Sequence, residues 1–327
     1  MHITLNRMQN ISEVKLIALN SSHSNQILSL IRLVQPSLPW TIEYLEWQFY
    51  ENPAGPALIY GFRNFKGDLV ALYAAVPQHL KDKDGVVLAR MVQDVMTHPD
   101  YRGRGLLHRL AERCLLDMRE AGEVGYTFPN EKSANSFQRT GWTQLFIVPA
   151  RQIKLSSSKT MDRPTDIDLI PVAGLFEESI VSVWQASGLK CGVDRTAAFL
   201  NWRYKKPHTE YFKFYVNKTE GFLVLKIYST PTYEVLHICD LLVREDRRAL
   251  IPKILQFCLN FAFTKKVSVL EAWLYEKHPY AIYFDQIGLK VNANPDRRVF
   301  VFDGKPRNAG LTDAQLWHLT QGDSDVY

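Results

Sequence analysis

The hydrophobic and polar positions in the first half of the chain form short alternating runs separated by helical stripes. Runs that alternate every second residue predict strands, and apolar residues three or four positions apart predict one face of a helix. Prolines and glycine-bearing turns separate the runs. The pattern predicts a strand, two helices and two strands of a meander, in that order, over residues 13–19, 21–34, 41–50, 57–62 and 69–77.

The sharpest change of pattern lies between residues 86 and 122. Residues 86–97 are apolar and β-branched, which is typical of a largely buried strand, and His98-Pro99 ends it. A helical stripe then runs from Leu106 to Met118 and stops at Gly122. A strand, a helix and a strand are predicted to follow over residues 124–128, 131–140 and 142–148. This mixture predicts an α+β sheet domain that ends near residue 153.

The turn between that strand and that helix, Tyr101-Arg102-Gly103-Arg104-Gly105, carries candidate chemistry. Its glycines allow successive backbone N–H groups to point at one spot, and the start of the helix adds partial positive charge. Arg102 and Arg104 add two full positive charges. Such a turn suits a pyrophosphate group. An Arg-Gly pair before a helix is also typical of a solvated turn, so the residues alone leave both interpretations open.

The second half of the chain repeats the pattern of the first. A polar stretch at residues 154–168, with serines and a proline, predicts a linker near mid-chain. Three motifs then recur at nearly equal spacing: Leu45-x-Trp47-x-Phe49 as Leu200-x-Trp202-x-Tyr204, residues 92–96 as 238–242, and Phe137-x-x-x-Gly141 as Phe284-x-x-x-Gly288. We therefore expect two related domains, residues 1–153 and residues 169–327.

The second domain lacks the glycines of the candidate turn. Residues 243–250, which stand at the equivalent place, contain none, so their backbone N–H groups are less able to converge on a phosphate. This difference predicts a degenerate copy, kept for folding or for shaping a substrate cleft.

Composition and charge exclude several classes of protein. A hydrophobic content of 46% and a charged content of 22% are ordinary for a soluble globular chain. The net charge of +5 is spread among acidic residues, which argues against nucleic acid as a partner. The N-terminus lacks the apolar core of a signal peptide, and no apolar run is long enough to span a membrane. We therefore expect a cytoplasmic protein without a membrane partner.

The cysteines give no sign of a metal site or a disulfide framework. Cys114, Cys191, Cys239 and Cys258 are widely spaced, and most of them sit inside apolar helix or strand patterns. No Cys-x-x-Cys or His-x-x-x-His spacing occurs. We expect free core thiols and no bound metal.

Two blocks resemble the acetyl-CoA-binding elements of the GNAT acyltransferase superfamily. Arg102-x-x-Gly105-x-Leu107 is similar to the family's Arg/Gln-x-x-Gly-x-Gly/Ala, with Leu107 in place of a small residue. Asn130-x-x-Ser133-x-x-x-Phe137-x-x-x-Gly141-Trp142 resembles the family's Asn-x-x-Ala-x-x-x-Tyr-x-x-x-Gly-Phe. The resemblance implies two tandem GNAT-like units, each a mixed, mostly antiparallel sheet flanked by helices. The C-terminal tail resembles those of tandem GNAT proteins from bacterial surface-polysaccharide gene clusters.

The resemblance implies that acetyl-CoA is the co-substrate, and it indicates which residues contact it. The backbone of residues 95–97 would pair with the pantetheine amides, residues 102–107 would hold the pyrophosphate, and Asn130 and Ser133 would line the pantetheine arm. The residues expected to contact acetyl-CoA are Val95, Met96, Thr97, Arg102, Gly103, Arg104, Gly105, Leu106, Leu107, Asn130 and Ser133.

Acyl transfer to an amine needs a deprotonated nucleophile and sometimes an acid for the departing thiolate. Asp94 is the candidate base, although an acidic residue there could equally orient a loop, and Asp240 stands at the same place in the second domain. Phe137 stands where the family has the acid, a tyrosine, and cannot donate a proton. Since a thiol pKa is about 8.5, the thiolate still leaves tolerably well without an acid.

Three aromatic residues lie on helices that border the acceptor cleft in this family. Trp47, Tyr50 and Trp202 could stack on a sugar, or they could belong to the core.

Together these expectations describe an N-acetyltransferase that acts on a small-molecule amine. A nucleotide-linked amino sugar is one acceptor class. The sequence leaves open whether the protein forms a homo-oligomer. An aminoacyl-tRNA-dependent transferase of the same fold and a non-catalytic CoA-binding or scaffold protein are the alternatives.

Overall fold

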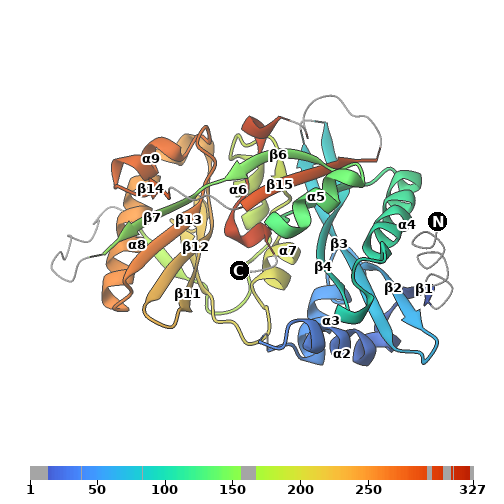
Figure 1. Ribbon diagram of the computed structural model, residues 1–327. Helices are drawn as coiled ribbons and strands as arrows, with labels where there is room; N and C mark the ends of the chain where they lie inside the picture. Colours follow the sequence, from blue (N-terminus) through green and yellow to red (C-terminus); the bar gives the residue numbers. More distant parts are fainter. Residues whose placement is uncertain are drawn as a thin grey trace. The chain divides into compact units, whose positions relative to one another are not determined.

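A computed structural model describes residues 14–37, 39–82, 84–155, 167–292, 297–304, 311 and 313–324 of the chain. Most of the predicted linker, residues 156–166, lies outside this range, as does the end of the tail, residues 325–327. The chain divides into two compact units, and each is described by itself (Figure 1). None of the helices in the described ranges is long and apolar enough to cross a membrane.

The first unit contains the elements that the sequence pattern predicts, with ends that agree within a few residues. Thr41 caps the second helix by accepting a hydrogen bond from the N–H of Tyr44, and Gly122 ends the longest helix in the left-handed conformation. Its elements are β1 (Val14–Leu19), α2 (Ser24–Val34), α3 (Ile42–Phe49), β2 (Leu58–Asn64), β3 (Leu69–Asp82), β4 (Gly85–Thr97), α4 (Leu106–Ala121), β5 (Val124–Thr127), α5 (Glu131–Arg139) and β6 (Thr143–Val148).

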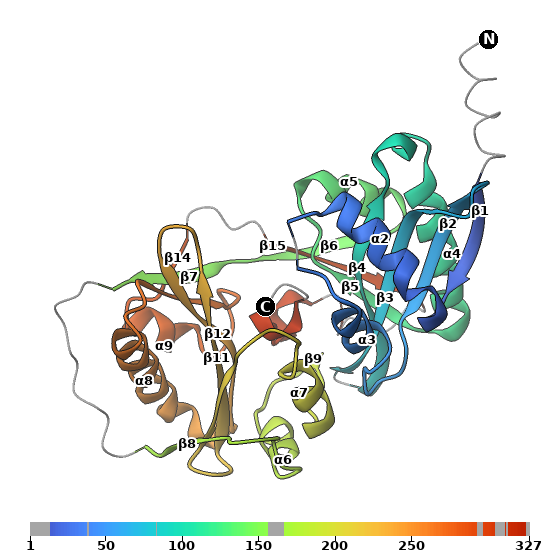
Figure 2. The same cartoon turned by 90° about the horizontal axis from the view of Figure 1, so that it is seen from below.

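The first sheet has the order β1-β2-β3-β4-β5-β15-β6, where β15 is Arg297–Asp303. Alternate residues of β3, such as Tyr73, face a core cluster built from α4, α5 and the sheet. The intervening residues, such as Leu72, are also buried, and α2 and α3 lie on that opposite face (Figures 1 and 2). Since helices cover both faces, β3 is apolar at every position from Leu69 to Pro77.

The second unit contains a seven-stranded sheet with the order β14-β7-β13-β12-β11-β10-β8. In Figure 1, α8 and α9 lie on one side of this sheet, and α6 and α7 lie on the other. Its elements are β7 (Ala150–Lys154), β8 (Leu169–Pro171), α6 (Ile180–Gln185), α7 (Ala197–Arg203), β10 (Phe212–Val216), β11 (Gly221–Ser229), β12 (Glu234–Val243), α8 (Ile251–Thr264), β13 (Val269–Trp273), α9 (Ala281–Gln286) and β14 (Lys290–Val291). The short strand β9 (Gly192–Val193) pairs instead with the end of β3, at Leu80 and Lys81.

The repeated sequence motifs occupy equivalent elements in the two units. The tryptophan motif lies on α3 and on α7, the aspartate motif on β4 and on β12, and the Phe-x-x-x-Gly motif begins on α5 and on α9. In both units the strand with the aspartate pairs in parallel with the next strand along the chain. The predicted α+β fold class, with two tandem units that each contain a mixed sheet flanked by helices, is confirmed.

The two units do not coincide with the contiguous ranges 1–153 and 169–327. β15, from the second half of the chain, pairs antiparallel with β5 in the first sheet. β7, from the first half, pairs antiparallel with β13 in the second sheet. The first half therefore supplies β7 to the second sheet, and the second half supplies β15, besides the short β9, to the first sheet. Local periodicity predicts that a strand exists, but it does not specify which neighbour that strand pairs with.

The exchanged strand β15 contributes buried side chains to the first core. Phe302 is 4% exposed and its ring lies 5.7 Å from that of Trp142, measured between centroids. We expect Phe302→Ala to lower the free energy of unfolding of the first unit by about 3–5 kcal/mol, because it leaves a cavity in that core. Urea denaturation combined with hydrogen exchange of the β5 amides measures this effect.

The matched control is Phe65→Ala, since Phe65 is 77% exposed in the same unit. It is expected to change the unfolding free energy by less than about 0.5 kcal/mol. Loss of protection confined to the second sheet in Phe302→Ala would show that β15 does not belong to the first core.

Candidate functional site

The last residues of β4 extend beyond the end of the neighbouring strand. β4 and β5 pair in parallel from Ala89–Val124 to Val92–Thr127. Thr127 is the last residue of β5, and its hydroxyl donates a hydrogen bond of 2.8 Å to the carbonyl oxygen of Val92. β4 continues to Thr97, and within the described residues no strand pairs with 94–97 on the β5 side. The two strands therefore part, and one backbone edge of β4 borders a wedge.

Asp94 lies where the strands part. Its φ of 52° is in the left-handed region, which aspartate tolerates better than most residues but which strands seldom contain. Its carboxylate Oδ2 accepts a hydrogen bond of 2.5 Å from Nε2 of Gln48 on α3. Gln48 is itself buried, so the helix holds the half-buried carboxylate in one orientation. Asp94, the residue expected to act as the base, is therefore held in a fixed orientation.

Gln48 was not among the residues that the sequence singled out. It follows Trp47, and it lies three residues after Leu45 on the buried face of the helix. A polar side chain at such a position needs a hydrogen-bond partner within the fold. A polar residue on the apolar face of this helix is the feature of the sequence that could have identified Gln48. That feature does not identify Asp94 as its partner.

The connection from β4 to α4 has the predicted glycine turn. A short 3₁₀ turn (Pro99–Tyr101) leads into it, and Gly103 and Gly105 each have a φ of 75°. A Cβ at either glycine would meet nothing within 4 Å, so it is the backbone conformation that requires glycine and not a lack of space. Gly105 is the N-cap of α4, so the turn delivers the chain directly to the helix start.

The start of α4 is electropositive. The first backbone N–H groups of a helix have no acceptor within it, and the helix dipole adds partial positive charge there. Arg102 is exposed, and its Nε donates to the carbonyl oxygen of Thr97 at 3.3 Å. Arg104 lies over the ring of Tyr101 at 4.8 Å and donates to the carbonyl oxygen of Asp100 at 3.0 Å. Two guanidinium groups therefore flank the helix start, as an anion site requires.

Leu107, which departs from the family motif, has a packing role. It is half-buried, and it contacts the core cluster of the first unit beside Leu106 and Leu110. Because its side chain packs against the core, the departure leaves the backbone N–H groups of the first helical turn in place.

The second predicted block forms the start of α5. Asn130 is the N-cap, and its side chain accepts a hydrogen bond of 3.0 Å from the N–H of Ser133. The Ser133 hydroxyl donates to Asn130 Oδ1 at 3.2 Å. Phe137 is buried, and its ring packs edge-on against Trp142 with centroids 5.5 Å apart. Capping and core packing account for these residues, and pantetheine contacts by Asn130 and Ser133 stay a prediction.

The three predicted acceptor-side aromatic residues differ in exposure. Trp47 is 5% exposed and packs against Tyr44 at 5.4 Å between centroids, so its faces are covered. Tyr50 is half-buried, and burial raises its pKa. Trp202 is half-buried against Phe199 in the second unit. Trp47 belongs to the core, and we do not assign it to an acceptor.

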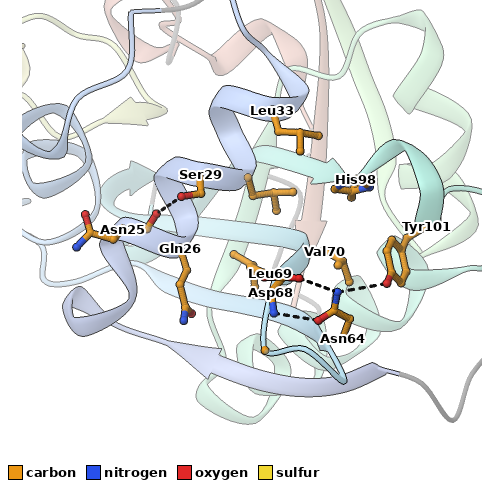
Figure 3. A pocket seen from close by; sticks show the side chains of 12 residues that line it. Asn25, Gln26, Ser29, Leu33, Asn64, Asp68, Leu69, Val70, His98 and Tyr101 are labelled. Atoms are coloured by element: carbon orange, nitrogen blue, oxygen red, sulfur yellow. Dashed lines mark hydrogen bonds between the residues drawn. The ribbon is translucent and has the colours of Figure 1, made fainter.

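A cavity of about 410 Å³ lies beside the same connection in the first unit. His98 and Tyr101 form part of its wall, together with residues of α2 and of the β2–β3 turn (Figure 3). Its polar groups already take part in the fold: Asn64 Oδ1 accepts hydrogen bonds from the N–H groups of Lys66 and Asp68, both at 2.9 Å, and its amide donates to Tyr101. The chemistry of acyl transfer therefore fits the wedge better than this cavity.

The equivalent wedge in the second unit is filled by the protein itself. β12 and β13 pair from Val235–Val269 to Ile238–Ala272, and β12 continues to Val243. The phenol of Tyr280, which precedes α9, accepts a hydrogen bond of 3.2 Å from the N–H of Val243 and lies 3.2 Å from its carbonyl oxygen. A 3₁₀ helix (Glu245–Leu250) replaces the glycine turn. In the part of the second unit that the structure describes, Tyr280 occupies the strand edge at Val243, and the turn before α8 has no glycine.

Asp240, the counterpart of Asp94, lies in a buried polar network of the second unit. Arg195 donates from Nε to Asp240 Oδ2 at 3.2 Å and from Nη2 to Asp323 Oδ2 at 2.8 Å. Burial by itself raises the pKa of Asp240, but the Arg195 charge and the interactions with His318 together outweigh it, so the pKa is lowered. The hydroxyl of Tyr204 lies 3.2 Å from the same carboxylate oxygen. Asp240 is therefore an ionised structural partner of Arg195.

Two buried histidines extend this network. The N–H of Tyr280 donates to Nδ1 of His278 at 3.1 Å, and Nε2 of His278 lies 3.1 Å from Nδ1 of His318. This arrangement places the proton of neutral His278 on Nε2. Burial lowers the pKa of both imidazoles, so both are neutral in the folded protein.

The second unit should lose stability in mild acid. Below the ordinary histidine pKa of 6.5, the unfolded chain binds protons that the folded chain excludes from His278 and His318. Stability is therefore complete above that pH and falls as the pH drops below it. We expect His278→Gln to reduce the slope of the unfolding free energy against pH by up to about 1.4 kcal/mol per pH unit. Urea denaturation between pH 7.5 and 5 measures this slope.

The control is His79→Gln, because His79 is exposed in the first unit. It should leave the acid slope of the second unit unchanged. An identical slope in the wild type and in His278→Gln would contradict the assignment of a neutral buried imidazole.

The described residues contain no group of three or more histidine, cysteine, aspartate or glutamate side chains arranged to hold a metal ion. All four cysteines are buried and free, as expected. The chemistry available at the wedge comes from Asp94, the β4 backbone and the turn before α4.

Residues 16–145 match the family described as the acetyltransferase (GNAT) domain. No curated protein matches the chain. Three solved structures share the fold. A GCN5-related N-acetyltransferase from Anabaena variabilis ATCC 29413 superposes with a TM-score of 0.69 at 13% identity, over 89% of this chain and 73% of that chain. A probable N-acyltransferase from Enterococcus faecalis V583 superposes with a TM-score of 0.66 at 15% identity, over 89% of this chain and 72% of that chain.

The third structure is a tandem GNAT protein from the clavulanic acid biosynthesis pathway. It superposes with a TM-score of 0.59 at 14% identity, over 90% of this chain and 100% of that chain. At these identities the similarity shows the fold of both units and not a shared substrate.

Proposed function

We propose that this chain, whose first unit is a GNAT acetyltransferase domain, transfers an acetyl group from acetyl-CoA to a primary amine of a small molecule. The observation that carries the proposal is the parting of β4 from β5, directly before a glycine-arginine turn at a helix start. A linear donor with amides along its arm and a pyrophosphate at its end matches these two features in the same order.

The donor would lie along the open edge of β4. Backbone groups of residues 95–97 pair with the pantetheine amides in the manner of an added strand. The N–H groups at the start of α4 hold the pyrophosphate, with Arg102 and Arg104 beside it. Asn130 and Ser133 face the arm from the start of α5.

Asp94 would act at the thioester end of the donor. Its carboxylate takes a proton from the acceptor amine, directly or through water, as the nitrogen forms a bond to the acyl carbon. The carbon–sulfur bond breaks, and the electron pair leaves with sulfur as a thiolate. Gln48 holds the carboxylate in one orientation through its 2.5 Å hydrogen bond. The strained φ of Asp94 fits a residue whose direction matters for function.

The residue at the position of the family's acid, Phe137, cannot assist the thiolate. Phe137 is buried in the core and carries no proton to donate. Because a thiol has a pKa of about 8.5, the thiolate leaves without full protonation, and a slower turnover is the expected result.

The acceptor class that we favour is an amino sugar carried on a nucleotide, used in polysaccharide synthesis. The mild positive charge of +5 is compatible with such an anionic acceptor. An aminoacyl-tRNA donor would need no glycine-arginine turn, and a pure scaffold would need no positioned carboxylate at the wedge.

Arg102→Ala is expected to weaken acetyl-CoA binding about tenfold, because it removes one charge-assisted contact to the pyrophosphate. Isothermal titration calorimetry of the folded protein measures the change. Lys15→Ala is the control, since it removes an exposed positive charge from β1 of the same unit. No binding of acetyl-CoA by the folded wild type would overturn the proposed function.

Asp94→Asn is expected to lower kcat by about 10²–10⁴ with little change in the KM for acetyl-CoA, because the amide cannot accept the amine proton. Thiol release in the presence of an amine acceptor reports the rate. Glu51→Gln, an exposed acid next to α3, is the matched control and should retain wild-type kcat. Equal rates for Asp94→Asn and the wild type would leave Asp94 a structural residue only.

A further inference from the structure

The C-terminal segment of the second unit is buried although it is polar. Thr320, Gln321, Asp323 and Ser324 are at most 6% exposed, Gly322 is also buried, and residues Gln321–Asp323 form a 3₁₀ turn. A terminal segment of this composition is usually solvated. Its burial requires partners for its backbone and side chains, and the second unit supplies them.

The side chain of Gln321 contacts both parallel strands of the second sheet. Its Nε2 donates to Glu271 Oε1 on β13 at 2.9 Å and lies 3.0 Å from His237 Nδ1 on β12. His237 and Glu271 are register partners across the two strands. This pair forms one end of a groove that accepts an amide side chain.

Two arginines bind the rest of the segment. Arg203 on α7 donates from Nε to the carbonyl oxygen of Gly322 at 2.7 Å and from Nη2 to that of Ser324 at 2.6 Å. Arg195 donates from Nη2 to the Asp323 carboxylate at 2.8 Å and to the Thr320 hydroxyl at 3.2 Å. Both guanidinium groups are buried. The groove therefore recognises peptide carbonyls through one arginine and a carboxylate through the other.

The groove also selects against a side chain at one position. A Cβ on Gly322 would collide with the Tyr204 hydroxyl and would come within 3.0 Å of the Cys239 carbonyl oxygen. The φ of Gly322 is not in the left-handed region, so steric fit alone demands glycine there. Glycine in the middle of the segment is thus a recognition feature of the groove.

The groove lies at the place in the second unit that is equivalent to the surroundings of Asp94 in the first unit. Asp240 and Tyr204, which line it, stand where Asp94 and the α3 helix meet in the first unit. In the first unit the described residues put Gln48 there and leave Asp94 half-buried.

We propose that the second unit is a peptide-binding module whose resident ligand is residues 320–324 of its own chain. The groove formed by Arg195, Arg203, His237 and Glu271 binds a short turn-forming peptide with the pattern Gln-Gly-acidic. The segment is held by affinity and not only by covalent attachment, so it rebinds when supplied in trans. This proposal is independent of acetyl transfer by the first unit.

The first test separates the C-terminal segment, which begins at residue 311, from the rest of the chain by proteolysis. A protease recognition sequence replaces residues 305–310, and after cleavage the fragment that begins at residue 311 is followed by size exclusion and native mass spectrometry. We expect it to stay bound at micromolar concentration and to exchange with a synthetic peptide of residues 311–327. Release of the fragment from a body that keeps its circular dichroism would overturn the proposal.

The second test uses the intact chain, so it remains decisive if cleavage unfolds the body. Hydrogen exchange of residues 318–324 should be slowed at least 100-fold relative to an unstructured peptide. Gly322→Val should abolish that protection while β4 of the first unit keeps its own. Gly174→Val is the matched control, since a Cβ at Gly174 meets nothing within 4 Å. Unprotected amides in the wild type, or equal protection in both variants, would refute a specific groove.

Discussion

An interior strand exposes N–H and C=O groups on both edges, and each of these groups must find a partner. In the first unit β5 ends at Thr127 while β4 continues to Thr97, so part of one edge lacks a strand to pair with. The position of Asp94, the turn before α4 and the start of α5 are all set by where this parting occurs. A ligand with its own amides would complete the pairing, and for this reason the proposed donor site follows the backbone of this strand.

The second unit shows how the same fold satisfies the same edge without a ligand. Tyr280 places its phenol against Val243, and a 3₁₀ helix stands in for the glycine turn. Asp240 is neutralised by Arg195 in a fully buried network, whereas Asp94 is half-buried and hydrogen-bonded to a neutral amide. The two equivalent carboxylates therefore differ in burial and in the partner residues found here, Arg195 for Asp240 and Gln48 for Asp94.

Much of this architecture could be predicted from the sequence, for reasons that particular residues make clear. The stripe from Leu106 to Met118 predicted α4 because burial on one helix face imposes a spacing on apolar residues. The φ values of Gly103 and Gly105 confirm the turn, because only glycine adopts them without strain. The hydrogen bond from Gln48 to Asp94 and the fate of residues 320–324 were not predictable. Both depend on pairings between distant segments, for which local periodicity carries no signal.

The exchange of β7 and β15 has a consequence for how the chain is made. The ribosome delivers β5 long before β15, so the nascent first unit carries an unpaired strand edge while the whole second unit is synthesised. Neither sheet is complete until β14 and β15 have been synthesised. Folding of the two units is thus tied to a single late event, and a gene that encoded only one half would yield a protein with an open, aggregation-prone edge.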